Sequence, residues 1–338
     1  MDKNKYDFIP FEKLRGKNIL VTGACGLIGS AVIDFILENE KGCHVYAMAR
    51  NRKKAEVRFA KYLSNAVFHI VECDVNAPLS ENTVFHYIVN AASNAHPNTY
   101  ALDPVGTMWT NINGTKNLLD YGRTHGMERF LYVSSGEVYG EGDVDSWKEE
   151  DNGYVDCMTM RSCYPTSKRA AETLCVAYGE QYDVETVVAR PCHTYGPNFT
   201  ENDTRAFAQF IRNARNNENI VLKSRGGQFR SWLYVKDCAS AILTILLKGG
   251  NAQAYNVADK LSCVTIRDLA EMIAEIGGTK VVIDLPSETE KKGFSVIKKA
   301  TFNTDKLFGL GWRPLYKLQE ALVETVGISN RSMTDISR

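Results

Sequence analysis

The sequence has no excess of charge of either sign and no long apolar run. Lysine plus arginine and aspartate plus glutamate each number 40 in 338 residues, so no overall field draws the chain to nucleic acid or to an anionic membrane. No run approaches the roughly 18 apolar residues of a membrane span, and the charged residues 1–17 lack the apolar core of a secretory signal. The nine cysteines form no C-x-x-C pair and no cluster with histidine, which indicates reduced thiols and no metal site. We therefore expect a cytoplasmic protein.

A glycine pattern near the N-terminus carries the first positive signal. An apolar run at 18–21 precedes Gly23, Gly26 and Gly29, and a helix-periodic apolar stretch follows. At such a junction Gly23 permits a tight turn, Gly26 lets backbone approach a phosphate, and Gly29 lets the helix lie close to the sheet. A purely structural turn could use the same residues, and the spacing is G-x-x-G-x-x-G instead of G-x-G-x-x-G. The position between strand and helix nevertheless predicts a nicotinamide dinucleotide site.

Apolar β-rich runs and helix-periodic stretches alternate in the first half of the chain. This alternation predicts an α/β fold with a Rossmann-type, doubly wound parallel sheet. After residue 190 the elements become shorter and irregular, which predicts a smaller C-terminal α/β lobe for substrate over the carboxyl ends of the strands. We expect a dinucleotide-binding domain at 1–190 and a smaller ligand-binding lobe at 191–338, with the chain free to cross between them. The expected strands are 18–22, 44–48, 67–71, 86–90, 130–133 and 185–189, and the expected helices are 27–39, 52–63, 103–124 and 162–181.

A tyrosine and a lysine share one predicted helix face. Residues 164–168 read Tyr-Pro-Thr-Ser-Lys, and positions four apart on a helix point the same way. An ammonium beside a phenol favours the phenolate, so we expect Lys168 to lower the pKa of Tyr164 for proton transfer. Ser134, Ser135 and Glu137 follow an expected strand at the same edge of the sheet. An ordinary surface pair would explain Tyr-x-x-x-Lys alone, but the order of glycine loop, serine and pair argues against coincidence.

From about Lys17 to about Pro314 the chain resembles the extended short-chain dehydrogenase/reductase family, the NAD(P)-dependent nucleotide-sugar epimerases and dehydratases. The matching segments also include CDV at 73–75, NAA at 90–92, NINGT at 111–115, RPCHTYGP at 190–197 and RSWLYVKD at 230–237. The resemblance implies that Tyr164 is the acid/base on the sugar 4-hydroxyl, that Lys168 binds the nicotinamide ribose, and that Ser135 shares the proton. It implies cofactor contacts from Gly23, Cys25, Gly26, Leu27, Ile28, Arg50, Asp74, Val75, Ala91, Ala92, Asn111, Tyr164, Lys168 and Arg190. It implies substrate contacts from Ser134, Ser135, Glu137, His193, Arg205, Arg230 and Lys298, and a homodimer formed through helices 103–124 and 162–181.

The reaction subtype depends on the residues beside Ser135. Family members with a glutamate at the position of Glu137 are dehydratases or UDP-glucuronate decarboxylases, although Glu137 could also only bind loop backbone. Gly136 replaces the aspartate that hexose dehydratases use as an acid, and Lys298 lies in the region where the decarboxylases carry an arginine. His193 replaces a family asparagine and either contacts substrate or packs as a neutral imidazole. We favour a 4,6-dehydratase acting through a 4-keto intermediate over a decarboxylase or a 4-epimerase. An NADP-dependent carbonyl reductase and a non-catalytic dinucleotide sensor are the alternatives of other classes.

The end of the second expected strand bears on the cofactor. NAD-preferring proteins of this fold place an acidic residue there to bind the adenosine ribose. This chain has Ala49 followed by Arg50, and an arginine would attract a 2′-phosphate. A solvated basic first turn of the next helix is the simpler alternative. We expect NADP in preference to NAD.

Overall fold

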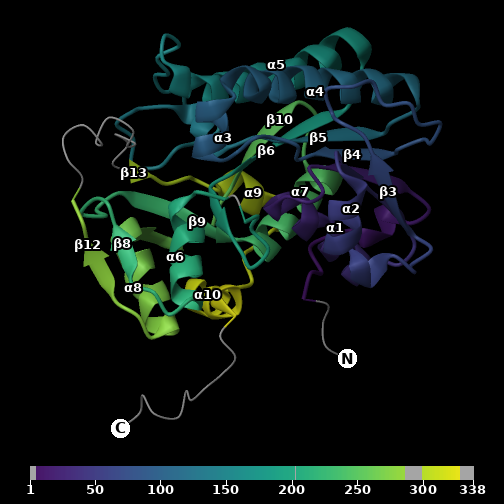
Figure 1. Cartoon of the computed structure of the whole chain (residues 1–338). Helices are drawn as coiled ribbons and strands as arrows, with labels where there is room; N and C mark the ends of the chain where they lie inside the picture. The colour runs from purple at the N-terminus through teal and green to yellow at the C-terminus, as the bar shows by residue number, and fades with distance from the viewer. Residues whose placement is uncertain (1–4, 202, 286–298, 328–338) are drawn as a thin grey trace.

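The computed structural model describes residues 5–201, 203–285 and 299–327; Lys298 lies outside them. Its larger part is a seven-stranded sheet, parallel throughout, with the strand order β10-β6-β5-β4-β1-β2-β3 (Figure 1). The order runs outward in both directions from the adjacent strands β1 and β4. The carboxyl ends of these two strands therefore form the switch point at which ligands bind in doubly wound sheets. The predicted Rossmann-type fold is confirmed.

The strands of this sheet are short and almost wholly buried, as expected for a parallel sheet covered on both faces. They are β1 (Asn18–Thr22), β2 (His44–Ala49), β3 (Phe68–Glu72), β4 (Tyr87–Asn90), β5 (Arg129–Val133), β6 (Thr186–Pro191) and β10 (Gln253–Val257). One face is covered by α4 (Pro104–Thr124) and α5 (Cys163–Tyr182), and the other by α1 (Leu27–Asn39), α2 (Arg52–Arg58) and α7 (Val235–Lys248). Single-turn 3₁₀ helices lie at Phe11–Leu14, Ala60–Tyr62, Gly136–Tyr139 (η3) and Met160–Ser162 (η4).

Two helices differ from the sequence prediction. The helix expected at 52–63 ends at Arg58, because Phe59 leaves helical geometry (φ −111°, ψ 25°) and its ring is fully buried. A short helix, α3 (Pro97–Leu102), precedes α4 and was not predicted. Asp103 separates the two helices by accepting a hydrogen bond from the backbone N–H of Gly106, which caps α4.

The smaller lobe has its own core. One sheet holds β11 (Cys263–Thr265), β9 (Phe229–Tyr234) and β13 (Lys299–Ala300), with β7 (His193–Tyr195) also paired to β9, and β12 (Val281–Ile283) pairs with β8 (Ile220–Leu222). The lobe helices are α6 (Ala206–Arg215), α8 (Ile266–Gly277) and α10 (Leu318–Val326), while α9 (Asp305–Gly309) contacts β10. Between the two sets of lobe strands the chain returns to the large sheet as α7 and β10. The boundary at residue 190 remains a prediction as a division into domains.

None of the helices in the described segments has the length and apolar character needed to cross a bilayer. All nine cysteines lie in the described segments, and each carries a free thiol.

Candidate active site

The glycine turn after β1 closes tightly against neighbouring backbone. Gly23 has a φ of +61°, and a Cβ there would lie 2.5 Å from the carbonyl oxygen of Ala91. A Cβ on Gly29 would lie 2.4 Å from the carbonyl oxygen of Gly23, so the two glycines allow α1 to approach the strand. Gly26 is the N-cap of α1. The first N–H groups of α1 therefore point from a glycine-rich turn at the switch point, which fits a dinucleotide diphosphate.

The side chains around this turn are held by protein contacts. Leu27 packs into the lobe core and Ile28 packs against the core of the large sheet. Val75 packs against α4, where a Cβ on Gly114 would lie 2.9 Å from its methyl carbons. Burial raises the pKa of the partly exposed Cys25 thiol, so this cysteine is a small neutral side chain beside the turn.

The end of β2 carries no acidic side chain. Ala49 is the last strand residue, and Arg50 after it is exposed. Arg52 lies 3.8 Å from Glu72 at the end of β3 and is thus partly compensated. Asp74, beyond β3, accepts a hydrogen bond from the N–H of Asn76. Arg50, like Lys53 and Lys54 after it, is open to solvent, and it lies directly after the strand end, which fits the predicted 2′-phosphate contact.

A chain of buried polar groups anchors the ends of β1 and β4. Thr22 Oγ1 donates to Asn90 Oδ1 (2.7 Å), and the backbone N–H of Ala92 donates to Thr22 Oγ1 (3.2 Å). Asn90 Nδ2 donates to Thr115 Oγ1 (3.1 Å), and this hydroxyl donates to the carbonyl of Asn111 (2.6 Å). These bonds fix residues 91–92 beside the glycine turn, where the sequence predicts cofactor contacts.

Asn111 joins α4 to α5. Its Oδ1 accepts from Ser93 Oγ (2.8 Å) and its Nδ2 donates to Ser167 Oγ (2.9 Å), and the whole side chain is buried. Ser167 lies between Tyr164 and Lys168 on α5. Both ends of the Asn111 amide are therefore engaged with protein, and the geometry favours a role in aligning α5 over direct cofactor contact. The sequence analysis did not single out Ser93 or Ser167.

Lys168 is buried beneath the end of β5. Its Nζ donates to the carbonyl of Val133 at the end of β5 (2.9 Å) and lies 4.7 Å from the ring centre of Tyr132 and 5.8 Å from that of Tyr164. Burial lowers the pKa of Lys168 to about 7, although the charge of Glu172 opposes this shift. The ammonium thus loses much of its charge near neutral pH.

Tyr164 is also buried, and this corrects one expectation. Burial and the charge of Glu137 raise the pKa of Tyr164 to about 12, while Ser135 and two arginines lower it only in part. The expected lowering of this pKa by Lys168 is wrong for this geometry. A buried lysine with a lowered pKa provides too little charge to offset the desolvation of a phenolate.

The loop after β5 presents Ser135 and Glu137 near Tyr164. Ser135 caps η3, its Oγ accepting from the N–H of Glu137 (3.2 Å). A side-chain hydrogen bond with Ser135 also lowers the pKa of Tyr164, against the larger effect of burial. Ser134 is buried, and its Oγ has no hydrogen-bond partner among the described residues. A buried hydroxyl without a partner is costly, which fits a group that meets a ligand here.

Two residues that the sequence analysis missed complete this corner. Arg161 Nη2 lies 2.7 Å from Glu137 Oε2, and the Arg161 guanidinium lies over the Tyr100 ring at 4.7 Å. The Tyr100 ring in turn stacks on Tyr164, with 5.5 Å between ring centres and 29° between planes. The available signal was the position of Arg161, three residues before Tyr164.

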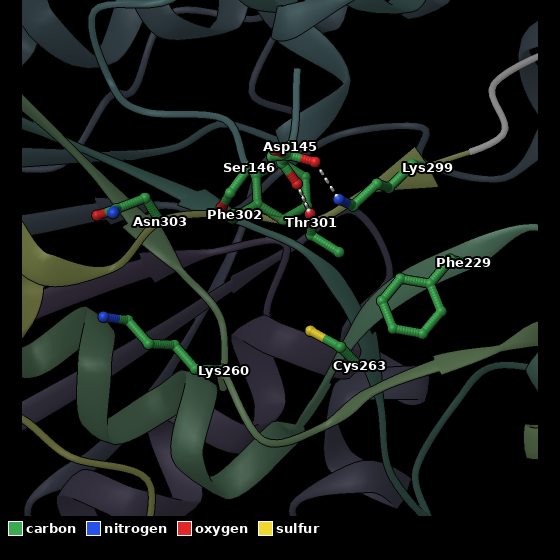
Figure 2. Close-up of a pocket in the computed structure, with 9 residues that line it drawn as sticks. All are labelled: Asp145, Ser146, Phe229, Lys260, Cys263, Lys299, Thr301, Phe302 and Asn303. Carbon is green, nitrogen blue, oxygen red and sulfur yellow. Dashed lines mark hydrogen bonds and ion pairs between the residues drawn. The ribbon is translucent and has the colours of Figure 1, made fainter. Parts of the chain in front are cut away.

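Gly136 is backed by an aromatic ring. A Cβ on Gly136 would lie 2.4 Å from Phe302 Cζ, so the ring fills the space that a side chain would need. Phe302 also lines a cavity of about 560 Å³ between the segment 145–146 and the lobe sheet, where Asp145 pairs with Lys299 (Figure 2). None of the predicted catalytic residues lines this cavity, which meets the catalytic loop only through Phe302.

The lobe contributes a histidine and two arginines. His193 lies on β7 beside Trp232 of β9, with 5.3 Å between ring centres. Its surface is exposed, but desolvation by surrounding protein and the charges of Arg230 and Arg205 lower its pKa to about 3. Arg230 is buried, and burial lowers its pKa also. His193 is therefore a neutral donor and acceptor at physiological pH.

Arg205 is fixed by a buried carboxylate. Its Nε and Nη2 donate to Asp203, with distances of 3.0 and 2.6 Å to Oδ1 and Oδ2. His96, the N-cap of α3, places Nδ1 3.2 Å from Asp203 Oδ1. Burial raises the pKa of Asp203, but His96 and Arg205 outweigh it and hold this pKa well below its usual range. The contact ties the lobe to the loop after β4.

Arg190 has a different environment from the one predicted. Its Nε and Nη2 donate to Glu172 (3.0 and 2.7 Å), and its Nη1 donates to Tyr139 Oη (3.0 Å) and to the carbonyl of Glu149 (2.9 Å). All three guanidinium nitrogens are thus engaged in a largely buried ion-pair cluster. These contacts argue against cofactor binding by Arg190, because four of its five N–H donors are spent on Glu172, Tyr139 and Glu149.

The profile of the NAD dependent epimerase/dehydratase family matches residues 19–258. UDP-glucuronic acid decarboxylase 6 of Arabidopsis thaliana is 32% identical over 308 residues, which cover 90% of this chain and 86% of that protein. UDP-glucuronic acid decarboxylase 1 of Xenopus tropicalis is 31% identical, with 95% of this chain and 74% of that protein covered.

Solved structures share the fold. DesIV, a dTDP-glucose 4,6-dehydratase from Streptomyces venezuelae with NAD and TYD bound, has a TM-score of 0.80 at 24% identity, covering 91% of this chain and 95% of that one. UDP-glucose 4-epimerase from Thermotoga maritima, with UDP-glucose, has a TM-score of 0.78 at 23% identity, covering 91% and 97%. The profile match, the relatives and the fold agree: the chain belongs to the NAD-dependent epimerase/dehydratase family, within the extended short-chain dehydrogenases/reductases.

Proposed function

We propose that this protein decarboxylates a nucleotide-linked hexuronic acid through a 4-keto intermediate. The observation that carries the proposal is the composition of the loop after Ser135. Gly136 has no room for a side chain beside Phe302, and Glu137 is paired with Arg161. The site therefore has an acid/base tyrosine but no free carboxyl group beside it.

The first half of the reaction uses groups already described. Tyr164, with Ser135, takes the proton of the sugar 4-hydroxyl, and the turn at Gly23 and Gly26 with the N-terminus of α1 holds the cofactor diphosphate. A bound nicotinamide would supply the hydride acceptor that a 4-keto intermediate needs, and the cofactor would regain its starting oxidation state by the end of turnover. Tyr164 and Lys168 are buried away from water. The phenolate of Tyr164 is therefore poorly solvated, and the phenol remains a weak acid until substrate and cofactor change its surroundings.

A 4-keto sugar activates the bonds at C5 in two ways. Loss of the C6 hydroxyl as water requires a base for the C5 proton and an acid for the leaving hydroxide. Glu137 is engaged in an ion pair with Arg161, and Gly136 provides no acid. Loss of CO₂ requires no acid for the leaving group, because the bond electrons move into the ketone. This difference reverses our preference from the sequence, where 4,6-dehydration came before decarboxylation.

The relatives also favour decarboxylation over 4,6-dehydration, since proteins called UDP-glucuronic acid decarboxylases are 31–32% identical over about nine tenths of the chain. We also propose that NADP is the preferred cofactor, on the basis of Ala49 and the exposed Arg50. His193, Arg205 and Arg230 are proposed to contact the nucleotide diphosphate or sugar, since two phosphates require cations and hydrogen-bond donors.

A homodimer through α4 and α5 is a further proposal. Val105 and Trp109 of α4 are 75% and 58% exposed, and Val176 and Tyr182 of α5 are 43% exposed each. Apolar side chains gathered on two adjacent helices favour burial against a second copy. Light scattering on the native protein and on Trp109→Glu tests this: a dimer that the variant splits supports it, and a native monomer contradicts it.

Mass spectrometry tests the reaction itself. Purified protein is incubated with NADP or NAD and with UDP-glucuronate, UDP-, dTDP-, GDP- and CDP-hexoses in turn. Loss of CO₂ from the uronate supports the proposal, whereas loss of water from a hexose establishes a dehydratase. A product of unchanged mass with an altered sugar NMR spectrum establishes an epimerase. Turnover of none of them, or reduction of simple carbonyl compounds alone, rejects nucleotide-sugar chemistry.

A further inference from the structure

Arg161 is held at two points beside the acid/base tyrosine. It belongs to η4, directly before α5, and its Nη2 lies 2.7 Å from Glu137 Oε2. Its guanidinium carbon lies over the Tyr100 ring, 4.7 Å from the ring centre, and Tyr100 stacks on Tyr164. A cation over an aromatic face keeps its edge free for hydrogen bonds. The orientation of the guanidinium is thus coupled to the position of the catalytic phenol.

The donors of Arg161 differ from those of the arginines around it. A guanidinium carries five N–H donors, and among the described residues only Nη2 of Arg161 donates to protein. By contrast, Arg205 spends Nε and Nη2 on Asp203, and Arg169 spends Nε and Nη2 on backbone carbonyls. Arg161 is also 53% exposed, so its remaining donors are accessible.

We propose that Arg161 selects the substrate by binding the carboxylate of the hexuronic acid, which it bridges to Glu137; this inference rests on the proposed decarboxylase function. The planar guanidinium matches a carboxylate in geometry and charge. A substrate carboxylate brought next to Glu137 alone would be repelled by a like charge. Arg161, shared between the two carboxylates, removes that repulsion, and a neutral hexose gains nothing from it.

The chemistry limits what Arg161 can do for the rate. In the 4-keto sugar the C5–C6 bond breaks, its electron pair moves into the C4 enolate, CO₂ leaves, and C5 takes one proton. Negative charge therefore leaves the carboxylate as the bond breaks, so an ion pair to it is stronger in the ground state than in the transition state. Arg161 acts on substrate binding and orientation more than on the chemical step.

Binding measurements on two variants and a control test the inference. Titration calorimetry gives the Kd of UDP-glucuronate, UDP-glucose and UDP for the native protein, Arg161→Gln, Arg161→Lys and Arg267→Gln. Arg267 is a matched control, since it is also 53% exposed and pairs with a glutamate, Glu271, but lies on α8. We expect Arg161→Gln to weaken UDP-glucuronate about tenfold or more, a loss comparable to one charged hydrogen bond. UDP and UDP-glucose should bind as before, Arg161→Lys should be intermediate, and the control should be unchanged.

If Arg161→Gln lost affinity equally for all three ligands, or lost none for UDP-glucuronate, the inference would be overturned. Circular dichroism and thermal melting show whether the variants fold, and Arg161→Lys provides the same comparison if Arg161→Gln does not. The ratio of the two sugar affinities does not depend on turnover. If the native protein decarboxylates UDP-glucuronate but Arg161→Gln keeps the native ratio of UDP-glucuronate to UDP-glucose affinity, only the role of Arg161 is rejected. A uronate preference lost in Arg161→Gln, without decarboxylation by native protein, would reject the proposed function alone.

Discussion

The ring of Phe302 occupies the place of a side chain on Gly136, because a Cβ there would lie 2.4 Å from Cζ of the ring. The glycine belongs to the loop after β5, and the ring comes from the C-terminal part of the chain that follows β13. The two residues are complementary in volume, and the loop that carries Ser135 and Glu137 rests on the ring. This packing decides which side chains the catalytic loop can contain.

Substitution of Gly136 by alanine should therefore overpack the loop. We expect the free energy of unfolding to fall by about 1–3 kcal/mol, the range for an added methyl group in a filled site. Phe302→Ala should cost about 3–5 kcal/mol by leaving a cavity. The double variant should lose less than the sum, since the alanine then meets no ring. Urea unfolding of the four proteins measures this, and strictly additive losses would contradict the contact.

Tyr164→Phe should remove proton transfer and little else. We expect the turnover rate to fall by about 10²–10⁴, the usual contribution of general acid–base catalysis. Binding of the nicotinamide cofactor, followed by fluorescence, should stay within a few fold. Tyr182→Phe, at the exposed end of the same helix, is the matched control and should keep full activity. Retained turnover in Tyr164→Phe would exclude this tyrosine as the acid/base.

The buried ammonium of Lys168 should make stability depend on pH. Its pKa is about 7 in the folded protein and about 10.4 in an unfolded chain. Between these values the unfolded chain binds more protons, so this group makes the free energy of unfolding rise with pH from about 7 to about 10. Its destabilising effect is complete below the lower value and absent above the higher one.

Lys168→Met should abolish that dependence. Its unfolding free energy, measured by urea titration without added cofactor, should exceed the native value most at pH 6 and least near pH 10. Curves that run parallel over this range would show that Lys168 does not titrate differently in the two states.

Arg50→Asp should shift cofactor preference from NADP toward NAD. The carboxylate would repel a 2′-phosphate and accept hydrogen bonds from the ribose hydroxyls of NAD. Lys53→Asp makes the same charge change in the first turn of α2 and should have a smaller effect. Kd values for both cofactors measure the shift. An unchanged ratio in Arg50→Asp, or an equal shift in Lys53→Asp, would contradict a specific contact by Arg50.

The amino-acid sequence determined most of the strands and helices of the large sheet and their order along the chain. The spacing of glycines at 23, 26 and 29 predicts a tight strand-to-helix turn. In the structure Gly23 lies close to the backbone of Ala91, and Gly29 lies close to the backbone of Gly23. The alternation of strand and helix periods predicts a parallel sheet, since parallel strands need helical crossovers. These properties depend on neighbours a few residues apart, so they can be deduced without knowing the fold. The helix that carries Tyr164 and Lys168 could likewise be predicted from its local sequence.

The tertiary structure alone decided the partners of the charged side chains. Arg190 was predicted to bind cofactor, but folding places Glu172, Tyr139 and the carbonyl of Glu149 around it and uses four of its five N–H donors. Arg161 carried no motif, yet folding brings it to Glu137. The pKa of Tyr164 rises to about 12 where a local rule predicts a decrease. Burial and charge at one atom are sums over groups distant in sequence, so the sequence determines the scaffold and only the folded chain determines the state of its catalytic groups.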